Sequence, residues 1–223
     1  MTFFTDEIIM LAEELYQFYD IPKLKKERSI LKNCRGLGDG IWDILGFYVP
    51  STYEVVICDS EIENYAKKLA QSSPEYDNDF TKLALRELVR LHEHGHALLH
   101  TGNIGPLRRF KKGYKSLPSV VNEPITEFIA WSTLKRFGTK FFEKIFEKVD
   151  ENTPDYYQKW KDIKQMIDCQ SENIDYIDYI PGLVYVARKE LWKDFESFCK
   201  GLEQEWNVIK TITIARRIGR KEK

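Results

Sequence analysis

Residues 79–102 read DFTKLALRELVRLHEHGHALLHTG. Leucine and valine recur three or four positions apart, which is the spacing that gathers side chains on one face of a helix. Asp79 offers an N-cap, no proline interrupts the run, and Gly102 stands where a glycine commonly ends a helix. We therefore predict one long, largely apolar helix that is buried in the fold.

The middle of this helix carries the pattern His-Glu-x-x-His, formed by His92, Glu93 and His96. Residues four apart lie on one helix face, so the two imidazoles can bind a single zinc ion. Glu93 points to the side of the metal, where a carboxylate can take a proton from an activated water. A polar helix face with solvated histidines is the alternative. The apolar helix, and the confinement of all four histidines of the chain to residues 92–100, favour metal binding.

The composition fits a globular protein of 223 residues, either one large domain or one domain with an appendage. Charged residues make up 31%, and the formal net charge is −1. This balance indicates neither direct nucleic-acid binding nor association with a membrane. The N-terminal pattern is unlike a signal peptide, and the four scattered cysteines favour a reduced interior, so we expect a cytoplasmic location.

Periodicity and turn residues give a coarse map of the rest of the chain. Residues 5–20 and 60–71 are expected to be helices. Residues 44–49 and 53–58, rich in valine, isoleucine and tyrosine, are expected to pair as a hairpin around a Pro-Ser-Thr turn. Residues 139–200 have mostly helical spacing.

Three further segments carry weaker signals. Residues 36–40 contain three glycines without the flanking elements of a phosphate loop, so a flexible loop is expected. The basic segment 108–115 is either a substrate-binding rim or an ordinary solvated loop. The end, residues 210–223, carries six basic residues and is expected to be a solvated tail rather than a nucleic-acid contact.

A catalytic zinc ion takes three protein ligands and leaves one position for water. His100 lies one more turn along the same helix and does not readily complete a tetrahedron with His92 and His96. We expect it to cap and pack the helix end, with contact to the second shell as the alternative. His94 should point away from the metal. The third ligand should therefore be a carboxylate from elsewhere in the chain.

Residues 122–127, Asn-Glu-Pro-Ile-Thr-Glu, resemble the glutamate-helix motif of thermolysin-like gluzincins. That resemblance implies that Glu123 is the third metal ligand. It also implies that Glu127 hydrogen-bonds a ligand imidazole from the second shell. Acidic residues that merely favour a helix N-terminus are the simpler alternative, and Pro124 fits the first turn of such a helix.

Roughly residues 6–137 resemble the ImmA/IrrE family of metallopeptidases. The most specific part is His-Glu-x-Gly-His-x-Leu-Leu-His at residues 92–100. The segments 46–50 and 55–59, and Glu123 with Ile129-Ala130, add to the likeness. The resemblance implies an intracellular protease whose substrate is a protein such as a helix-turn-helix transcriptional repressor.

Together these observations predict an α+β fold with a zincin-like core, a small sheet and a mainly helical C-terminal part. We expect a metallopeptidase domain at residues 1–138 and a helical extension with a basic tail at residues 139–223. The expected function is that of a zinc endopeptidase with Glu93 as its general base. A non-proteolytic zinc-binding regulator, or an interaction protein of the toxin–antitoxin type, is the alternative.

Overall fold

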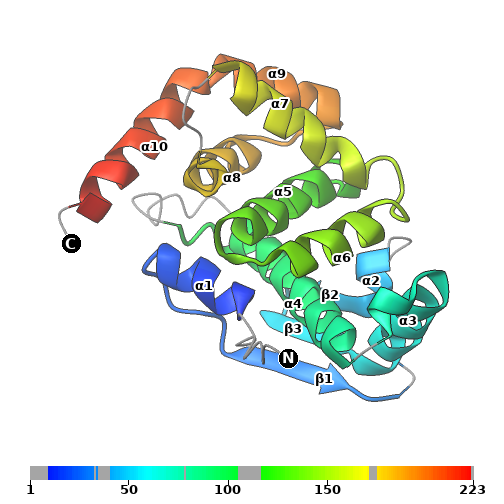
Figure 1. Cartoon of the computed structure of the whole chain (residues 1–223). Helices are drawn as coiled ribbons and strands as arrows, with labels where there is room; N and C mark the ends of the chain where they lie inside the picture. The colour runs from blue at the N-terminus through cyan, green and yellow to red at the C-terminus, as the bar shows by residue number, and fades with distance from the viewer. Residues whose placement is uncertain are drawn as a thin grey trace.

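The computed structural model describes residues 10–32, 34, 41–77, 79–104, 117–170 and 175–221. Its fold is α+β, as predicted, with a small sheet at one end and helices over the rest of the molecule (Figure 1). The glycine-rich segment 36–40 and the basic segment 108–115 lie outside the described residues.

The sheet has three described strands, β1 (Lys26–Ile30), β2 (Gly46–Val49) and β3 (Glu54–Cys58), in the order β1-β3-β2. β2 pairs with β3 antiparallel, which confirms the predicted hairpin, whereas β1 pairs with β3 in parallel. The hairpin's first strand begins later than predicted, because the short helix α2 (Ile41–Leu45) precedes it.

Helix α4 (Asp79–Thr101) confirms the predicted central helix, and it packs across β2 and β3 (Figure 1). It ends as expected, because Gly102 adopts a left-handed conformation with φ of 58°. The next helix, α5 (Ser119–Phe137), begins earlier than predicted. Pro124 therefore lies inside the helix, and its placement in the first turn was wrong.

Helices on either side complete the N-terminal half. Helix α1 (Leu11–Phe18) buries its apolar face against α4, and it ends before Pro22. Helix α3 (Asp59–Ser72) follows β3 directly, as predicted, and the 3-10 turn η1 (Pro74–Tyr76) leads into α4.

The remaining helices lie beyond α4 and α5, on the side away from the sheet, and the last of them packs mainly on the two helices before it (Figure 1). They are α6 (Lys140–Asp150), α7 (Trp160–Gln170), α8 (Ile180–Lys189), α9 (Phe195–Gln204) and α10 (Trp206–Lys221), with 3-10 turns η3 (Tyr157–Lys159) and η4 (Tyr176–Tyr179). Their apolar side chains join those of α4 and α5 in one continuous hydrophobic cluster. The division at residue 138 stays a prediction.

The predicted solvated tail is instead mostly the docked helix α10. Arg217 and Arg220 both pair with the buried Asp178 of η4. The guanidinium of Arg216 lies 4.3 Å from the centre of the Tyr19 ring, and that of Arg220 lies 4.3 Å from the Phe18 ring. These contacts hold the C-terminal helix against η4 and α1. They also place three of its arginines against a carboxylate or an aromatic ring.

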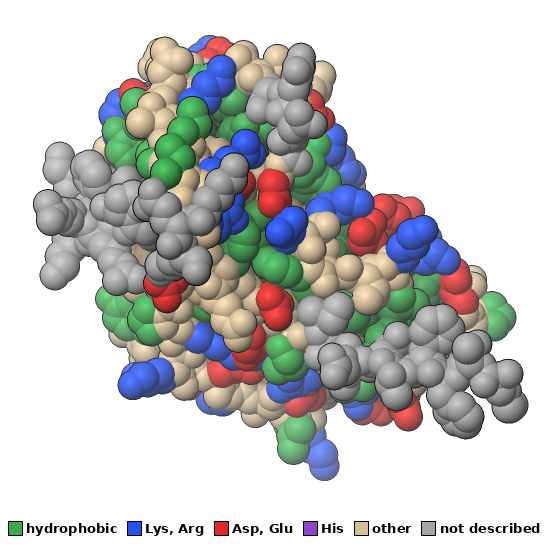
Figure 2. All heavy atoms as spheres, turned by 60° about the vertical axis from the view of Figure 1, so that its left-hand side comes forward, with side chains coloured by type: hydrophobic (Ala, Val, Ile, Leu, Met, Phe, Trp, Pro, Cys, Tyr) green, Lys and Arg blue, Asp and Glu red, His purple; other side chains and the backbone are tan. Residues whose placement is uncertain are grey.

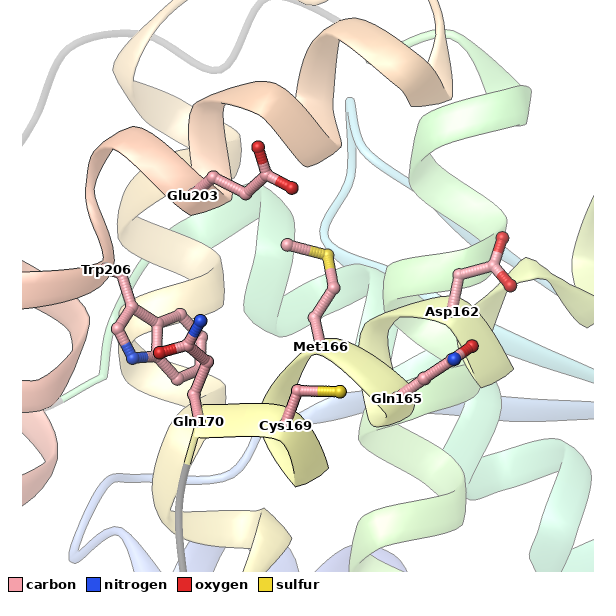
Figure 3. A pocket seen from close by; sticks show the side chains of 7 residues that line it. All are labelled: Asp162, Gln165, Met166, Cys169, Gln170, Glu203 and Trp206. Atoms are coloured by element: carbon pink, nitrogen blue, oxygen red, sulfur yellow. The ribbon is translucent and has the colours of Figure 1, made fainter.

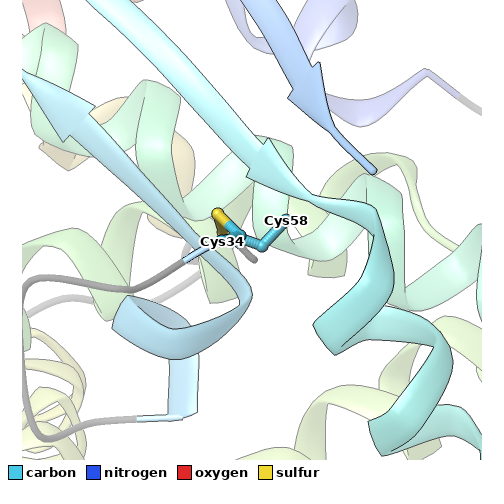
Figure 4. Close-up of a disulfide and its surroundings, with 2 residues drawn as sticks. All are labelled: Cys34 and Cys58. Carbon is cyan, nitrogen blue, oxygen red and sulfur yellow. A yellow bond between two sulfur atoms is a disulfide. The ribbon is translucent and has the colours of Figure 1, made fainter. Parts of the chain in front are cut away.

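Cys34 and Cys58 form a disulfide at the end of β3 (Figure 4). The expectation of reduced cysteines was therefore wrong for this pair. The bond joins residues that lie far apart in sequence, and spacing alone does not reveal which cysteines the fold brings together. Cys169 and Cys199 are free.

Acidic and basic side chains are interspersed with apolar ones on the face shown in Figure 2. This mixed surface agrees with the formal net charge of −1. None of the helices in the described part of the chain is both long enough and apolar enough to cross a lipid bilayer.

Candidate metal centre

Helix α4 places His92 and His96 side by side. Their Nε2 atoms are 3.1 Å apart, and both side chains are buried. The helix repeat produces this arrangement, because residues four positions apart lie on the same face about one turn from each other. The predicted pairing of the two imidazoles is thus present.

Helix α5 brings Glu123 to the same point. Its Oε2 lies 3.3 Å from His92 Nε2 and 3.2 Å from His96 Nε2. Burial raises the pKa of Glu123, but the two imidazoles outweigh that effect and hold it below its ordinary value. Among the described residues, no lysine or arginine pairs with this buried carboxylate. The three predicted ligands therefore converge.

The three ligand atoms form a nearly equilateral triangle with edges of 3.1, 3.2 and 3.3 Å. Ligand atoms bound to one tetrahedral zinc ion at about 2.0–2.1 Å lie about 3.3–3.4 Å apart. Such close approach of nitrogen and oxygen lone pairs is favourable only when a cation or shared protons lie between them. This buried group can hold a metal ion.

Glu93 lies beside the group on α4, and its side chain is 1% exposed. The start of β2 passes very close to it. A Cβ built on Gly46 would lie 3.3 Å from Glu93 Cγ and 2.6 Å from Val89 Cγ1. A glycine at position 46 therefore lets the strand approach the motif helix and close over Glu93, a role that sequence reasoning did not assign.

Glu127 is fully buried, and its Oε1 lies 3.7 Å from His92 Nδ1. Burial, with Asp150 and Glu123 nearby, raises the pKa of Glu127 well above its ordinary value. The indole of Trp42 stacks on the His92 ring with centroids 5.4 Å apart. Glu127 thus faces the nitrogen of His92 that a metal would not use, but at 3.7 Å the two atoms are too far apart for a hydrogen bond, so the predicted hydrogen bond to this imidazole stays a prediction.

Thr126 has a role that sequence reasoning missed. Its Oγ1 lies 3.2 Å from His96 Nδ1, so each candidate ligand histidine has a side chain of α5 near its second nitrogen. The signal was present in the sequence. Thr126 lies three positions after Glu123, so the two residues lie close together on the helix.

His94 points away from the group, as predicted. Its Nδ1 lies 3.0 Å from Tyr16 Oη, and its Nε2 lies 3.3 Å from Glu27 Oε2. The same network holds Arg90, whose guanidinium pairs with Glu27 and Glu13 at 2.8 Å. A partly buried charge network therefore joins α4 to α1 and β1 on the face opposite the candidate ligands.

His100 contacts the hairpin. Its Nδ1 lies 2.8 Å from Tyr48 Oη, and its ring stacks on Tyr53 with centroids 5.2 Å apart. The group of candidate ligand atoms does not include His100. Arg188 of α8 donates to the carbonyl of Leu99 at 2.8 Å and also to that of His100. We expected His100 to cap the end of this helix, but Arg188 caps it instead.

Comparison with known proteins gave no match. No family model, curated protein or solved structure matches the sequence. The likeness to the ImmA/IrrE family therefore stays a prediction. What supports a function is the geometry of the site itself.

Proposed function

We propose that this protein is a zinc-dependent endopeptidase. The observation that carries the proposal is the buried triangle of His92, His96 and Glu123, with Glu93 next to it on the same helix. A purely structural metal site is closed by a fourth protein ligand and has no use for an adjacent base. Here the group has three members among the described residues, and a buried carboxylate adjoins it.

Bound at these residues, zinc would acidify a water molecule and polarise the carbonyl of a peptide bond. Glu93 would accept the proton from that water as it attacks the carbonyl carbon, and would pass the proton to the departing amine. The short range of proton transfer requires Glu93 to be held in place. The close approach of β2 at Gly46 provides that restraint.

Glu127 and Thr126 would orient the two ligand histidines. A side chain at each Nδ1 would fix the ring angle and leave the Nε2 lone pair directed at the metal. The raised pKa of Glu127 matches a carboxyl group that is buried close to two other acids.

Strand β2 is at an edge of the described sheet and packs against α4. An extended peptide could add to this edge through backbone hydrogen bonds and so bring a scissile bond to the metal. We propose a protein substrate on these grounds. A helix-turn-helix repressor is the substrate class that the family resemblance implies.

Cleavage of a peptide library tests the proposal. Purified protein is incubated with a proteome-derived library in three states, as purified, after removal of metal by a chelator, and after return of zinc. New termini should be found with metal and should disappear without it. If zinc-loaded protein produces none, the hydrolase proposal fails, and a zinc-binding regulator or a toxin–antitoxin-type partner becomes the better reading.

A further inference from the structure

A second feature of the molecule lies far along the chain from the metal centre. Helices α7, α9 and α10 enclose a pocket of about 360 Å³ (Figure 3). That volume is within the range of roughly 300–1,000 Å³ that is typical of ligand sites in proteins. Its lining comprises Asp162, Gln165, Met166, Cys169, Gln170, Glu203 and Trp206.

The floor of the pocket is apolar. Met166 and Trp206 are both packed against the hydrophobic core, and Trp206 is only 8% exposed. Its indole ring is fixed by stacking on Tyr179, with centroids 5.9 Å apart. Figure 3 shows Met166 pointing from α7 toward Glu203 of α9. A flexible thioether beside a fixed indole can accommodate an aliphatic chain of varied shape.

The rim of the pocket carries two exposed carboxylates, those of Asp162 and Glu203. Neither Asp162 nor Glu203 makes an ion pair with a residue in the described part of the chain. Neighbouring carboxylates on the same two helices are paired. Asp168 binds Lys164 at 2.5 Å, and Glu196 binds Lys200 at 2.7 Å. The two carboxylates at the pocket are thus available to a cation from outside.

The negative charge of these carboxylates acts on the neighbouring thiol of Cys199. Burial and the charges of Asp162 and Glu203 raise the pKa of the Cys199 thiol to about 11, and they outweigh the opposite effect of Lys159. Negative potential above an apolar floor selects a ligand that combines a positive head with an aliphatic stem. Lysine and arginine side chains have that construction.

We infer that this pocket is a docking site for a lysine or arginine side chain presented by a segment of a partner protein. The stem would lie on Met166 and Trp206, and the charged head would lie between Asp162 and Glu203.

This inference does not depend on the metal centre. Cys169 lines the pocket and carries a free, exposed thiol, so its alkylation reports occupancy. The probe is a short amphipathic peptide of leucine and lysine, and its control is the same peptide with glutamate in place of lysine. We expect the lysine peptide alone to slow alkylation of Cys169 in the full-length protein. Equal protection by both peptides, or by neither, would overturn the inference.

Two matched double variants localise the effect. Asp162→Asn with Glu203→Gln removes the rim charges and should weaken binding of the lysine peptide roughly tenfold, because rim carboxylates attract the cation. Asp168→Asn with Glu196→Gln removes the same charge from the same helices at paired positions outside the pocket, and it should bind like the wild type. Equal loss in both double variants would mean that the peptide senses only general negative charge. Thermal melting checks that all variants fold.

Discussion

Gly95 of α4 and Thr126 of α5 are in such close contact that a Cβ built on Gly95 would lie 2.9 Å from Thr126 Cγ2. The two motif helices can therefore approach each other only because position 95 has no side chain. That approach brings Glu123 to the two histidines, so the glycine inside the His-Glu-x-Gly-His run has a geometric role.

Gly95→Ala should lower both stability and metal affinity. Overpacking of a buried contact typically costs about 1–3 kcal/mol, and the shift of α5 would move Glu123 away from the histidines. Thermal melting and zinc titration measure the two effects. Gly219→Ala is the control, because a Cβ there would meet nothing within 4 Å. If Gly95→Ala binds zinc like the wild type, the close approach of the helices is not what positions Glu123.

Thr126→Val should weaken zinc binding roughly tenfold, in the range found when a partner of a ligand histidine is removed. Valine keeps the shape of threonine and loses the hydroxyl that faces His96 Nδ1. Thr133→Val is matched, because Thr133 is also buried on α5 but its hydroxyl bonds the backbone of Ile129. Similar zinc affinity in the two variants would contradict the assignment of Thr126.

Glu123→Gln should abolish stoichiometric zinc binding, whereas Glu127→Gln should keep one zinc per chain with affinity reduced about 10–100-fold. His94→Ala and His100→Ala should also retain one zinc, because neither residue belongs to the group of ligand atoms. Elemental analysis of the four purified variants decides the ligand set. Loss of metal in His100→Ala, with metal retained in Glu123→Gln, would reverse the assignment.

These residues show which features of the fold and of the candidate site could be predicted from the sequence. Helix α4 was predictable to within one residue at its end, because apolar spacing and a terminal glycine are local signals. The convergence of Glu123 with the histidines followed from the chemistry of zinc and from a family resemblance. Gly95, Thr126 and Gly46 were missed, because their roles arise from contacts between elements that are distant in the chain.

Strand β1 was not predicted. It carries lysine, glutamate and arginine, so it lacks the apolar alternation that signals a strand. Its place is set by pairing with β3 and by the bonds from Glu27 to Arg90 and His94. The start of α5 before Pro124 and the pairing of Cys34 with Cys58 were likewise decided by tertiary contacts.

Stability in acid should depend on Glu27. Burial raises the pKa of Glu27, but His94, Arg90 and Lys23 outweigh that effect and hold it below the ordinary value of 4.5. Because the folded pKa is the lower one, this carboxylate stabilises the protein above that value, and the contribution is lost as the pH falls below it. Burial also raises the pKa of Glu13, but Arg90 and Lys23 outweigh that effect and hold this pKa below its ordinary value.

Glu27→Gln should therefore reduce stability at neutral pH and flatten the decline in acid. Denaturant unfolding across the acidic range measures both effects. Glu147→Gln removes an exposed carboxylate on α6 that makes no ion pair with a described residue, and it should unfold like the wild type at every pH. A wild-type acid profile for Glu27→Gln would show that the network does not contribute to stability.

The most direct test of the account is the rate of peptide cleavage per bound zinc in Glu93→Gln. This variant keeps the three candidate ligands and the shape of the side chain, and it loses only the base. We predict one zinc per chain, wild-type melting, and a cleavage rate lower by at least ~10²-fold, as expected when a general base is removed. Cleavage near the wild-type rate by zinc-loaded Glu93→Gln would contradict the central claim.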